Sequence, residues 1–244
     1  GVEPINDNED PAAFDWTKFH FEWKRTDAHI SLVEQARAKG LTTFFVSPVM
    51  LEAWMTENNP DEYVEWALAI LLRWRDRGVE LPYFSIINEP GYKRSGIWSA
   101  EWMRTVVKRL GARMRQEGFR TMLVIPDDLN PAEAYKRASV VLRDSKARRY
   151  VGALAYHLYD TKVSELARDL AHMRNLAAEH GIPIWMTEFS VPNDMTFSGA
   201  MEWMKIIHKL VATYDVSAVD YMWGFFGAWE RNHTILSIEF LDGK

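Results

Sequence analysis

The sequence predicts an α/β protein of the (β/α)8 barrel, or TIM barrel, class, and three observations support this prediction. Short apolar runs alternate with amphipathic segments from residue 41 to the end of the chain. The runs are continuously apolar, which is typical of parallel strands covered on both faces. No glycine-rich phosphate loop follows any run, which disfavours a doubly wound nucleotide-binding sheet. We therefore interpret residues 1–244 as a single barrel domain.

Each element of this barrel has its own signal. The apolar runs predict strands at Leu41–Val46, Leu81–Ile87, Arg120–Ile125, Val151–Tyr156, Ile182–Met186 and Ala218–Phe226. Asn59 and Asn130 each precede a proline and an acidic residue, which is typical of a helix start. Glycines 78, 118 and 181 are predicted helix stops. Helices are thus expected at about Asp27–Lys39, 60–78, from Ser99 to Gly118, from Pro131, at Val163–His180 and at Ser198–Tyr214.

The length of the chain predicts an incomplete barrel. The predicted strands begin on average about 35 residues apart, so eight units would need about 280 residues, against 244 in the chain. Only six strands are clear. We expect the barrel to be N-terminally truncated, with the first strand, the first helix and most of the second strand absent. Gly1–Ile5 would then be no more than the tail of that second strand.

Composition excludes several classes of function. The 29 Lys and Arg residues are outnumbered by 34 Asp and Glu, which gives a net charge of -5 and argues against a nucleic-acid partner. No apolar run is long enough to predict a membrane span. The chain has no cysteine, which excludes thiol nucleophiles and zinc-thiolate sites, and its 7 histidines form no metal-binding motif. We expect no metal and no cofactor, whereas the 11 tryptophans suit a sugar-binding cleft.

Two glutamates are the strongest candidates for catalysis. Glu89 and Glu188 each follow an apolar run directly, at the carboxyl end of a predicted strand, where barrel enzymes place their active sites. Two carboxyl groups facing each other are what cleavage of a glycosidic bond requires: one is protonated to assist the leaving group, and the other is ionised. Their local sequences are Asn-Glu-Pro at 88–90 and Trp-Met-Thr-Glu-Phe at 185–189.

With these motifs the chain resembles the clan A glycoside hydrolases, most closely family 30. The His-x-Tyr at His157 and Tyr159 also suits that family, and residues 47–55 are similar to its Ser-Pro-Trp-Ser-Pro-Pro-x-Trp-Met stretch. Counting the last predicted strand as the eighth places Glu89 after strand four and Glu188 after strand seven, where the clan has its acid/base and its nucleophile. Val49 departs from the family by replacing a tryptophan of the sugar pocket.

The resemblance implies a retaining glycoside hydrolase that cleaves β-glycosidic bonds of a polysaccharide or oligosaccharide. It assigns the acid/base to Glu89 and the nucleophile to Glu188. Further residues would bind or surround the sugar: Asn88 at the 2-hydroxyl, His157 and Tyr159 at the pocket wall, Trp223 beneath the ring, and Trp54 and Trp229 as sugar platforms or as packed loop residues. An extracellular location is expected from such a substrate.

Other interpretations remain open from the sequence. A catalytically impaired barrel could still bind carbohydrate, and an unrelated lyase or isomerase could use the two glutamates for proton abstraction. Asp127 and Asp128 follow the third predicted strand and could bind sugar hydroxyls, but they directly precede the Asn-Pro helix start, so we favour a role in stabilising that helix N-terminus.

Overall fold

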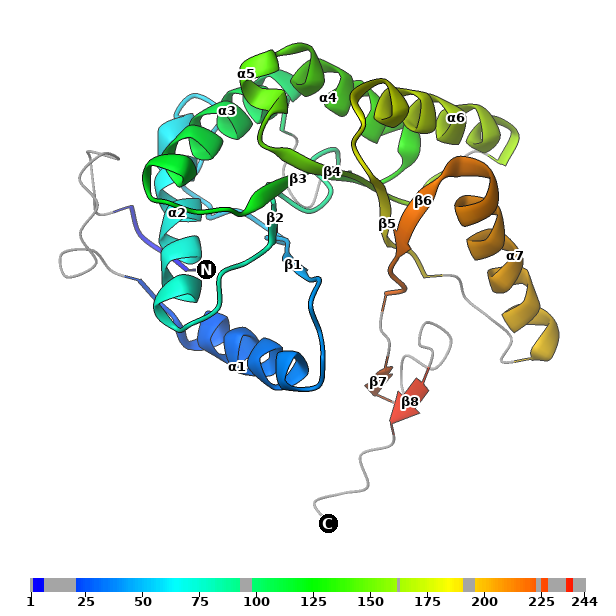
Figure 1. Ribbon diagram of the computed structural model, residues 1–244, viewed down its shortest axis with the longest axis horizontal. Coiled ribbons are helices and arrows are strands. Elements are labelled where there is room, and N and C mark those ends of the chain that lie inside the picture. Colours follow the sequence, from blue (N-terminus) through cyan, green and yellow to red (C-terminus); the bar gives the residue numbers. More distant parts are fainter. Residues whose placement is uncertain are drawn as a thin grey trace.

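The protein folds as a curled sheet of parallel strands with helices on its outer side (Figure 1). The computed structural model describes residues 2–6, 21–92, 98–161, 163–190, 196–222, 225–227 and 236–238. Six strands pair in the order β1-β2-β3-β4-β5-β6, all parallel: β1 (Phe45–Val46), β2 (Tyr83–Ser85), β3 (Met122–Asp128), β4 (Val151–His157), β5 (Ile184–Glu188) and β6 (Val216–Val219). The predicted parallel α/β architecture is thus confirmed as a half-barrel.

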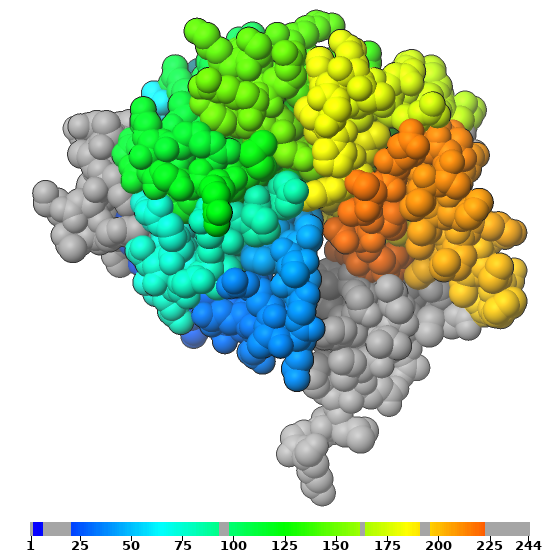
Figure 2. Space-filling view, in the orientation of Figure 1, coloured from blue at the N-terminus to red at the C-terminus, as the bar shows by residue number. Residues whose placement is uncertain are grey.

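The connecting helices form the outer layer, and most begin and end where the sequence predicts. They are α1 (Lys24–Ala38), α2 (Pro60–Asp76), α3 (Ala100–Gln116), α4 (Pro131–Arg143), α5 (Ser145–Arg148), α6 (Val163–His180) and α7 (Phe197–Tyr214). Figure 2 shows the colours passing round the molecule in chain order, from blue through green and yellow to orange. The Ser99 hydroxyl and the Asn130 amide oxygen accept the first-turn N–H groups of α3 and α4. Only α5 was not expected.

The largest differences between predicted and observed strands fall on three of them. The predicted strand Leu81–Ile87 is confined to Tyr83–Ser85. The first strand is confined to Phe45–Val46, and the predicted strand Ala218–Phe226 is divided into β6 and a separate β7 (Phe225–Gly227), which pairs with β8 (Leu236–Ile238). After β6 the backbone N–H groups of Asp220 and Met222 still donate to β5 and to Phe189, at 2.8 and 2.9 Å. The spacing of these bonds is irregular, so the chain follows β5 there without forming a regular strand.

Strands β1 and β6 are the two edges of the six-stranded sheet. A cavity of about 560 Å³ lies between them and is lined by seven residues, among them Phe45, Trp185 and Ala218. The sheet is therefore curled but not closed by the strands that the structure describes.

The core has one part on each face of the sheet. The larger part packs between the sheet and the helices, with Tyr63, Phe84 and Leu154 among its buried members. The smaller part fills the concave face with Val124, Ala153, Ala155 and Trp185. Because both faces are apolar, the strands read as continuous hydrophobic runs in the sequence. Among the described residues, no helix combines the length and apolar character needed to cross a bilayer.

Candidate active site

Glu89 and Glu188 both lie at the carboxyl edge of the sheet. Glu188 is the last residue of β5, where it pairs in register with His157, the last residue of β4. Glu89 follows β2 and has a left-handed backbone with φ of 49°, an uncommon conformation for a residue other than glycine. Its N–H donates to the Asp127 carbonyl at 2.8 Å, so the adjacent strand β3 fixes this strained position.

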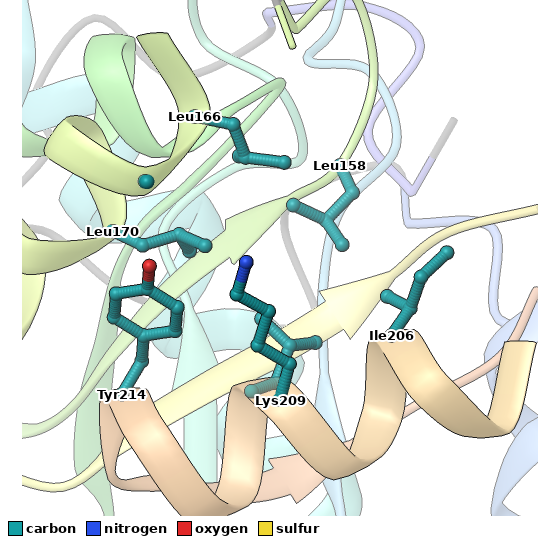
Figure 3. A pocket seen from close by; sticks show the side chains of 8 residues that line it. Leu158, Leu166, Leu170, Ile206, Lys209 and Tyr214 are labelled. Atoms are coloured by element: carbon teal, nitrogen blue, oxygen red, sulfur yellow. The ribbon is translucent and has the colours of Figure 1, made fainter. Parts of the chain in front are cut away.

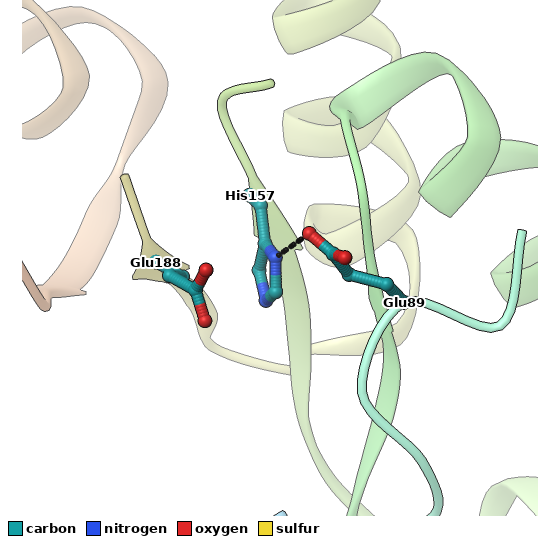
Figure 4. A group of neighbouring side chains, drawn as sticks. All are labelled: Glu89, His157 and Glu188. Carbon is teal, nitrogen blue, oxygen red and sulfur yellow. Dashed lines mark hydrogen bonds and ion pairs between the residues drawn. The ribbon is translucent and has the colours of Figure 1, made fainter. Parts of the chain in front are cut away.

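His157 brings the two glutamates together (Figure 4). Its Nδ1 lies 2.9 Å from Oε1 of Glu89, and one carboxylate oxygen of each glutamate and a ring nitrogen of His157 all lie within 4.8 Å of one another. His157 is 1 % exposed, whereas Glu89 is 8 % exposed and Glu188 is partly exposed. The imidazole therefore forms the floor of a site whose carboxyl groups are more accessible.

The carboxylate of Asp127 lies beneath this histidine and was misassigned from the sequence. It does not stabilise the N-terminus of α4. Its Oδ2 accepts the hydroxyls of Ser47 and Ser85 at 2.7 and 2.8 Å, and its Oδ1 accepts that of Thr187 at 2.6 Å. Nε2 of His157 lies 3.4 Å from the same Oδ1. Asp127 is thus part of the site's interior, and the sequence interpretation was wrong.

A local irregularity of β3 explains why Asp127 points inward. The pairing register between β3 and β4 shifts between Pro126 and Asp128, and Asp127 has φ of 59°. Such bulges break the simple alternation of faces and redirect a side chain, often next to an active site. Both Asp127 and Asp128 are buried as a result.

Asp128 also does not stabilise the N-terminus of α4. Its carboxylate is paired with Arg137 instead. Its Oδ2 accepts from Arg137 of α4 at 2.5 Å, and its Oδ1 accepts the N–H groups of Leu129 at 2.8 Å and Gly91 at 3.2 Å. Gly91 lies two residues after Glu89. Asp128 therefore ties the loop that carries Glu89 to β3 and α4.

Opposing effects set the protonation of the buried histidine and aspartate. Burial lowers the pKa of His157, but its hydrogen bonds with Asp127 and Glu89 and the charges of Asp127 and Glu188 raise that pKa to about 10. Burial raises the pKa of Asp127, but the bonds from His157, Ser47 and Thr187 outweigh it and lower the pKa. The pair is therefore an imidazolium and a carboxylate at neutral pH.

The environment of Glu188 combines burial with nearby donors. Burial raises its pKa, the charge of His157 and the nearby Tyr159 hydroxyl lower it, and the charges of Glu89 and Asp127 raise it, so that the net direction is upward. The Tyr159 hydroxyl donates to the sulfur of Met222 at 3.2 Å. The Tyr159 ring meets that of His157 edge-on at 6.0 Å. Tyr159 is thus placed beside both His157 and Glu188.

Of the remaining predicted sugar-binding residues, Asn88 and Trp54 lie in the described part of the chain. The Asn88 backbone is bonded to the Pro48 carbonyl at 2.9 Å, and within the described part of the chain its half-buried side-chain amide has no hydrogen-bond partner. The indole N–H of Trp54 donates to the Glu3 carbonyl at 2.8 Å, which ties Trp54 to the N-terminal segment and leaves only its ring face for a sugar. Trp223 and Trp229 lie outside the described residues.

The two glutamates and His157 have the donor types of a metal site, but the histidine does not fit one. A metal needs a lone pair on a neutral imidazole nitrogen. Here one ring nitrogen faces Glu89 and the other faces Asp127, so both carry hydrogens. The chemistry of this donor set is that of an imidazolium between carboxylates.

A second cavity, of about 220 Å³, lies between α6 and α7 on the outer side of the sheet (Figure 3). Apolar side chains such as Leu166 and Ile206 line most of it, and Lys209 is its one charged residue. It lacks the paired carboxyl groups of the sheet edge, which makes it unsuited to acid/base or nucleophilic chemistry on a sugar.

A parallel half-barrel with two glutamates at its carboxyl edge is similar to the site of glycoside hydrolases, and one family model agrees with this similarity. The family model described as "Glycosyl hydrolase catalytic core" matches residues 142–232, a range that contains His157, Tyr159 and Glu188. No curated protein sequence matches the chain.

Solved structures of family 30 enzymes share the fold. A family 30 endoxylanase from Clostridium papyrosolvens superposes with a TM-score of 0.68 at 22% identity, over 81% of this chain and 52% of that one. A family 30 subfamily 8 xylanase from Clostridium acetobutylicum gives 0.70 at 20% identity, over 93% and 57%. The xylanase C catalytic domain from Talaromyces cellulolyticus gives 0.67 at 18% identity, over 89% and 55%. The chain thus spans about half the length of these structures. The resemblance predicted from the motifs is confirmed at the level of fold and family model.

Proposed function

We propose that the protein is a retaining glycoside hydrolase that cleaves β-glycosidic bonds of a polysaccharide or oligosaccharide by double displacement. The separation of the two carboxylates carries the proposal. An oxygen of Glu89 and one of Glu188 lie within 4.8 Å of each other. Retaining enzymes have carboxyl groups about 5–5.5 Å apart, whereas inverting enzymes need about 6.5–9.5 Å to admit a water molecule. The upper bound of 4.8 Å on one pair of oxygens agrees with the retaining arrangement and supports direct attack by a carboxylate.

In the first step Glu188 attacks the anomeric carbon while Glu89 donates its proton to the glycosidic oxygen. The bond between the anomeric carbon and that oxygen breaks, the leaving group departs as an alcohol, and a glycosyl ester forms on Glu188. Glu89, now a carboxylate, then removes a proton from water as the water attacks the anomeric carbon. Glu188 is released as a carboxylate and Glu89 is protonated again. Each of the two displacements inverts the configuration of the anomeric carbon, so the product keeps the configuration of the substrate.

The surroundings of Glu188 support its role as the nucleophile. A partly buried carboxyl group between two other acids would tend to stay protonated, and the upward direction of its pKa reflects this. The imidazolium of His157 and the hydroxyl of Tyr159 act in the opposite direction and stabilise the carboxylate. The same two groups would stabilise the carboxylate when it leaves in the second step.

Sugar contacts are assigned by the same proposal. The free amide of Asn88, next to Glu89, would donate to the sugar 2-hydroxyl, and Trp223 would stack beneath the ring. Trp229 and the partly buried ring of Trp54 would extend the platform. Because the similar family 30 structures are those of xylanases, xylan is the first substrate to test.

An extracellular location is part of the proposal, because a polysaccharide substrate would lie outside the cell. The fold is shared, with a TM-score of 0.67 at 12% identity, by a structure described as a conserved exported protein from Bacteroides fragilis. Detection of the mature chain in the culture medium of its source would test this expectation.

Replacement of the nucleophile with addition of azide tests the mechanism. Glu188→Gly should abolish turnover of an activated aryl β-glycoside, and azide should restore it by forming the α-glycosyl azide, because a single inversion remains. Glu202→Ala, which removes an exposed acid of α7 paired with Lys205, is the matched control and should retain full activity. Formation of a β-azide by Glu188→Gly, or no effect of the substitution, would contradict the proposal. Binding of oligosaccharides by a wild-type chain that cleaves none of a broad panel would favour the carbohydrate-binding alternative.

A further inference from the structure

We propose that Asp127 is a positioning residue of the acid/base step: it holds His157 so that the Nδ1–H always points at Oε1 of Glu89. The inference rests on the proposed function, because it gives a role to a residue that acts through the acid/base. Asp127 itself is 1 % exposed and lies on the far side of the imidazole from Glu89, so it cannot touch a sugar.

The fixed geometry of the Asp127 carboxylate is the first step of the argument. Its two oxygens accept three hydroxyls and face one imidazole nitrogen, and these partners come from the carboxyl ends of β1, β2, β4 and β5. A buried carboxylate with this many donors is both ionised and held in one orientation. The half-barrel therefore places a permanent anion below His157.

The anion decides which hydrogens the imidazole carries. The Asp127 carboxylate accepts the hydrogen on Nε2, and its charge favours a second hydrogen on Nδ1, which Oε1 of Glu89 accepts, so His157 is a donor at both nitrogens. The other groups that face this ring are Glu188, whose negative charge favours the cation, and the neutral Tyr159 ring, which meets it edge-on. The pKa of about 10 for His157 agrees with this reading of the geometry.

The hydrogen on Nδ1 of His157 determines which oxygen of Glu89 carries the proton that is transferred. With a hydrogen always present on Nδ1, Oε1 of Glu89 is an acceptor in both states of the catalytic cycle. The transferable proton therefore resides on Oε2. An imidazole without the Nδ1 hydrogen would accept that proton itself and compete with the glycosidic oxygen. Asp127 removes this competitor by keeping the imidazole fully protonated.

The dependence of activity on the leaving group separates this role from a merely structural one. Asp127→Asn should lower kcat/KM by about 100-fold for substrates with poor leaving groups, which need the acid, and by less than about threefold for dinitrophenyl glycosides, which do not. Asp61→Asn is the matched control, because it makes the same change at an exposed aspartate paired with Arg109, outside the site, and it should show no dependence on the leaving group. An equal loss for Asp127→Asn on all leaving groups, or no loss, would overturn the inference.

A second measurement needs neither activity nor any substitution of Asp127. In nitrogen NMR of the wild-type chain, both ring nitrogens of His157, assigned by comparison with His157→Gln, should remain protonated from pH 6 to about pH 9. A neutral imidazole at pH 7 would overturn the inference. Failure of the chain to cleave any glycoside would refute the proposed function, whereas the NMR result would still decide the state that Asp127 imposes on His157.

Discussion

The imidazole of His157 on β4 and the carboxylate of Asp127 on the neighbouring β3 form an ion pair of 3.4 Å, in which each side chain is 1 % exposed. Buried charges of this kind are stable only when every hydrogen-bonding group is satisfied. Three hydroxyls complete the bonds of Asp127, and Glu89 takes the second hydrogen of His157. Stability and catalysis therefore share the same residues.

The free energy of unfolding should fall as the pH rises from about 6.5 to 10. His157 has a pKa of 6.5 when unfolded and about 10 when folded, so the folded state binds the extra proton in this window. Its contribution is fully present below pH 6.5 and is lost as pH approaches 10, with a slope of at most about 1.4 kcal/mol per pH unit. Urea unfolding at several pH values measures this. The slope should disappear in His157→Gln, and a wild-type stability that is constant over this range would count against the buried cation.

Asp127→Ala should lower the free energy of unfolding by about 3–5 kcal/mol, because it leaves an uncompensated imidazolium and three unpaired hydroxyls in the core. Asp61→Ala is the comparison, since Asp61 forms an exposed ion pair with Arg109 at 2.6 Å and its loss should change stability by less than about 1 kcal/mol. Denaturant unfolding compares the two variants. Equal effects would mean that Asp127 is not the buried anion described here.

Tyr159→Phe should shift the acid limb of the pH–activity profile to higher pH. The Tyr159 hydroxyl near Glu188 lowers the pKa of that carboxyl group, so its removal raises the pKa and a higher pH is needed to ionise the nucleophile. We also expect a loss of about 10–100-fold in kcat/KM, the size of one hydrogen bond to a charged group. The profile of kcat/KM between pH 4 and 9 measures both effects, and an unchanged acid limb would separate Tyr159 from Glu188.

Gly111→Ala in α3 should destabilise the protein by about 2–3 kcal/mol, although alanine favours helices. A Cβ at this position would lie 2.2 Å from ring atoms of Tyr150, and neither the helix nor the ring has room to move apart without disturbing the core. Gly118→Ala has free space around the Cβ but a φ of +80°, so it should cost about 1 kcal/mol through backbone strain alone. A smaller effect at Gly111 than at Gly118 would contradict the close packing of α3 against Tyr150.

The sequence predicted the parallel order of the sheet because its strands are apolar on both faces. It predicted helix boundaries where a local signal exists, as at Ser99 and Asn130, whose side chains cap α3 and α4. The sequence did not predict the end of a strand where only the loss of a pairing partner, and no change in composition, marks that end. The run Ala218–Phe226 is apolar throughout except for Asp220, and only the partners of β6 and β7 show that it contains two strands.

The two glutamates could be predicted because they follow strands, and the same rule could have found Asp127. Ser47, Ser85 and Thr187 also lie at strand ends, and all three hydroxyls converge on that carboxylate. The adjacent Asn130–Pro131 helix start gave Asp127 an alternative explanation. The bulge that turns it inward depends on the register between β3 and β4, which one strand's sequence does not reveal.

The most direct test of the central claim is to identify the residue that becomes covalently bound to the sugar. An activated 2-deoxy-2-fluoro-β-glycoside should inactivate the protein, and mass spectrometry of the digested chain should find the glycosyl ester on the peptide that contains Glu188. Glu188→Gln should not be labelled. Hydrolysis that releases the inverted anomer, with no adduct on Glu188, would contradict the account.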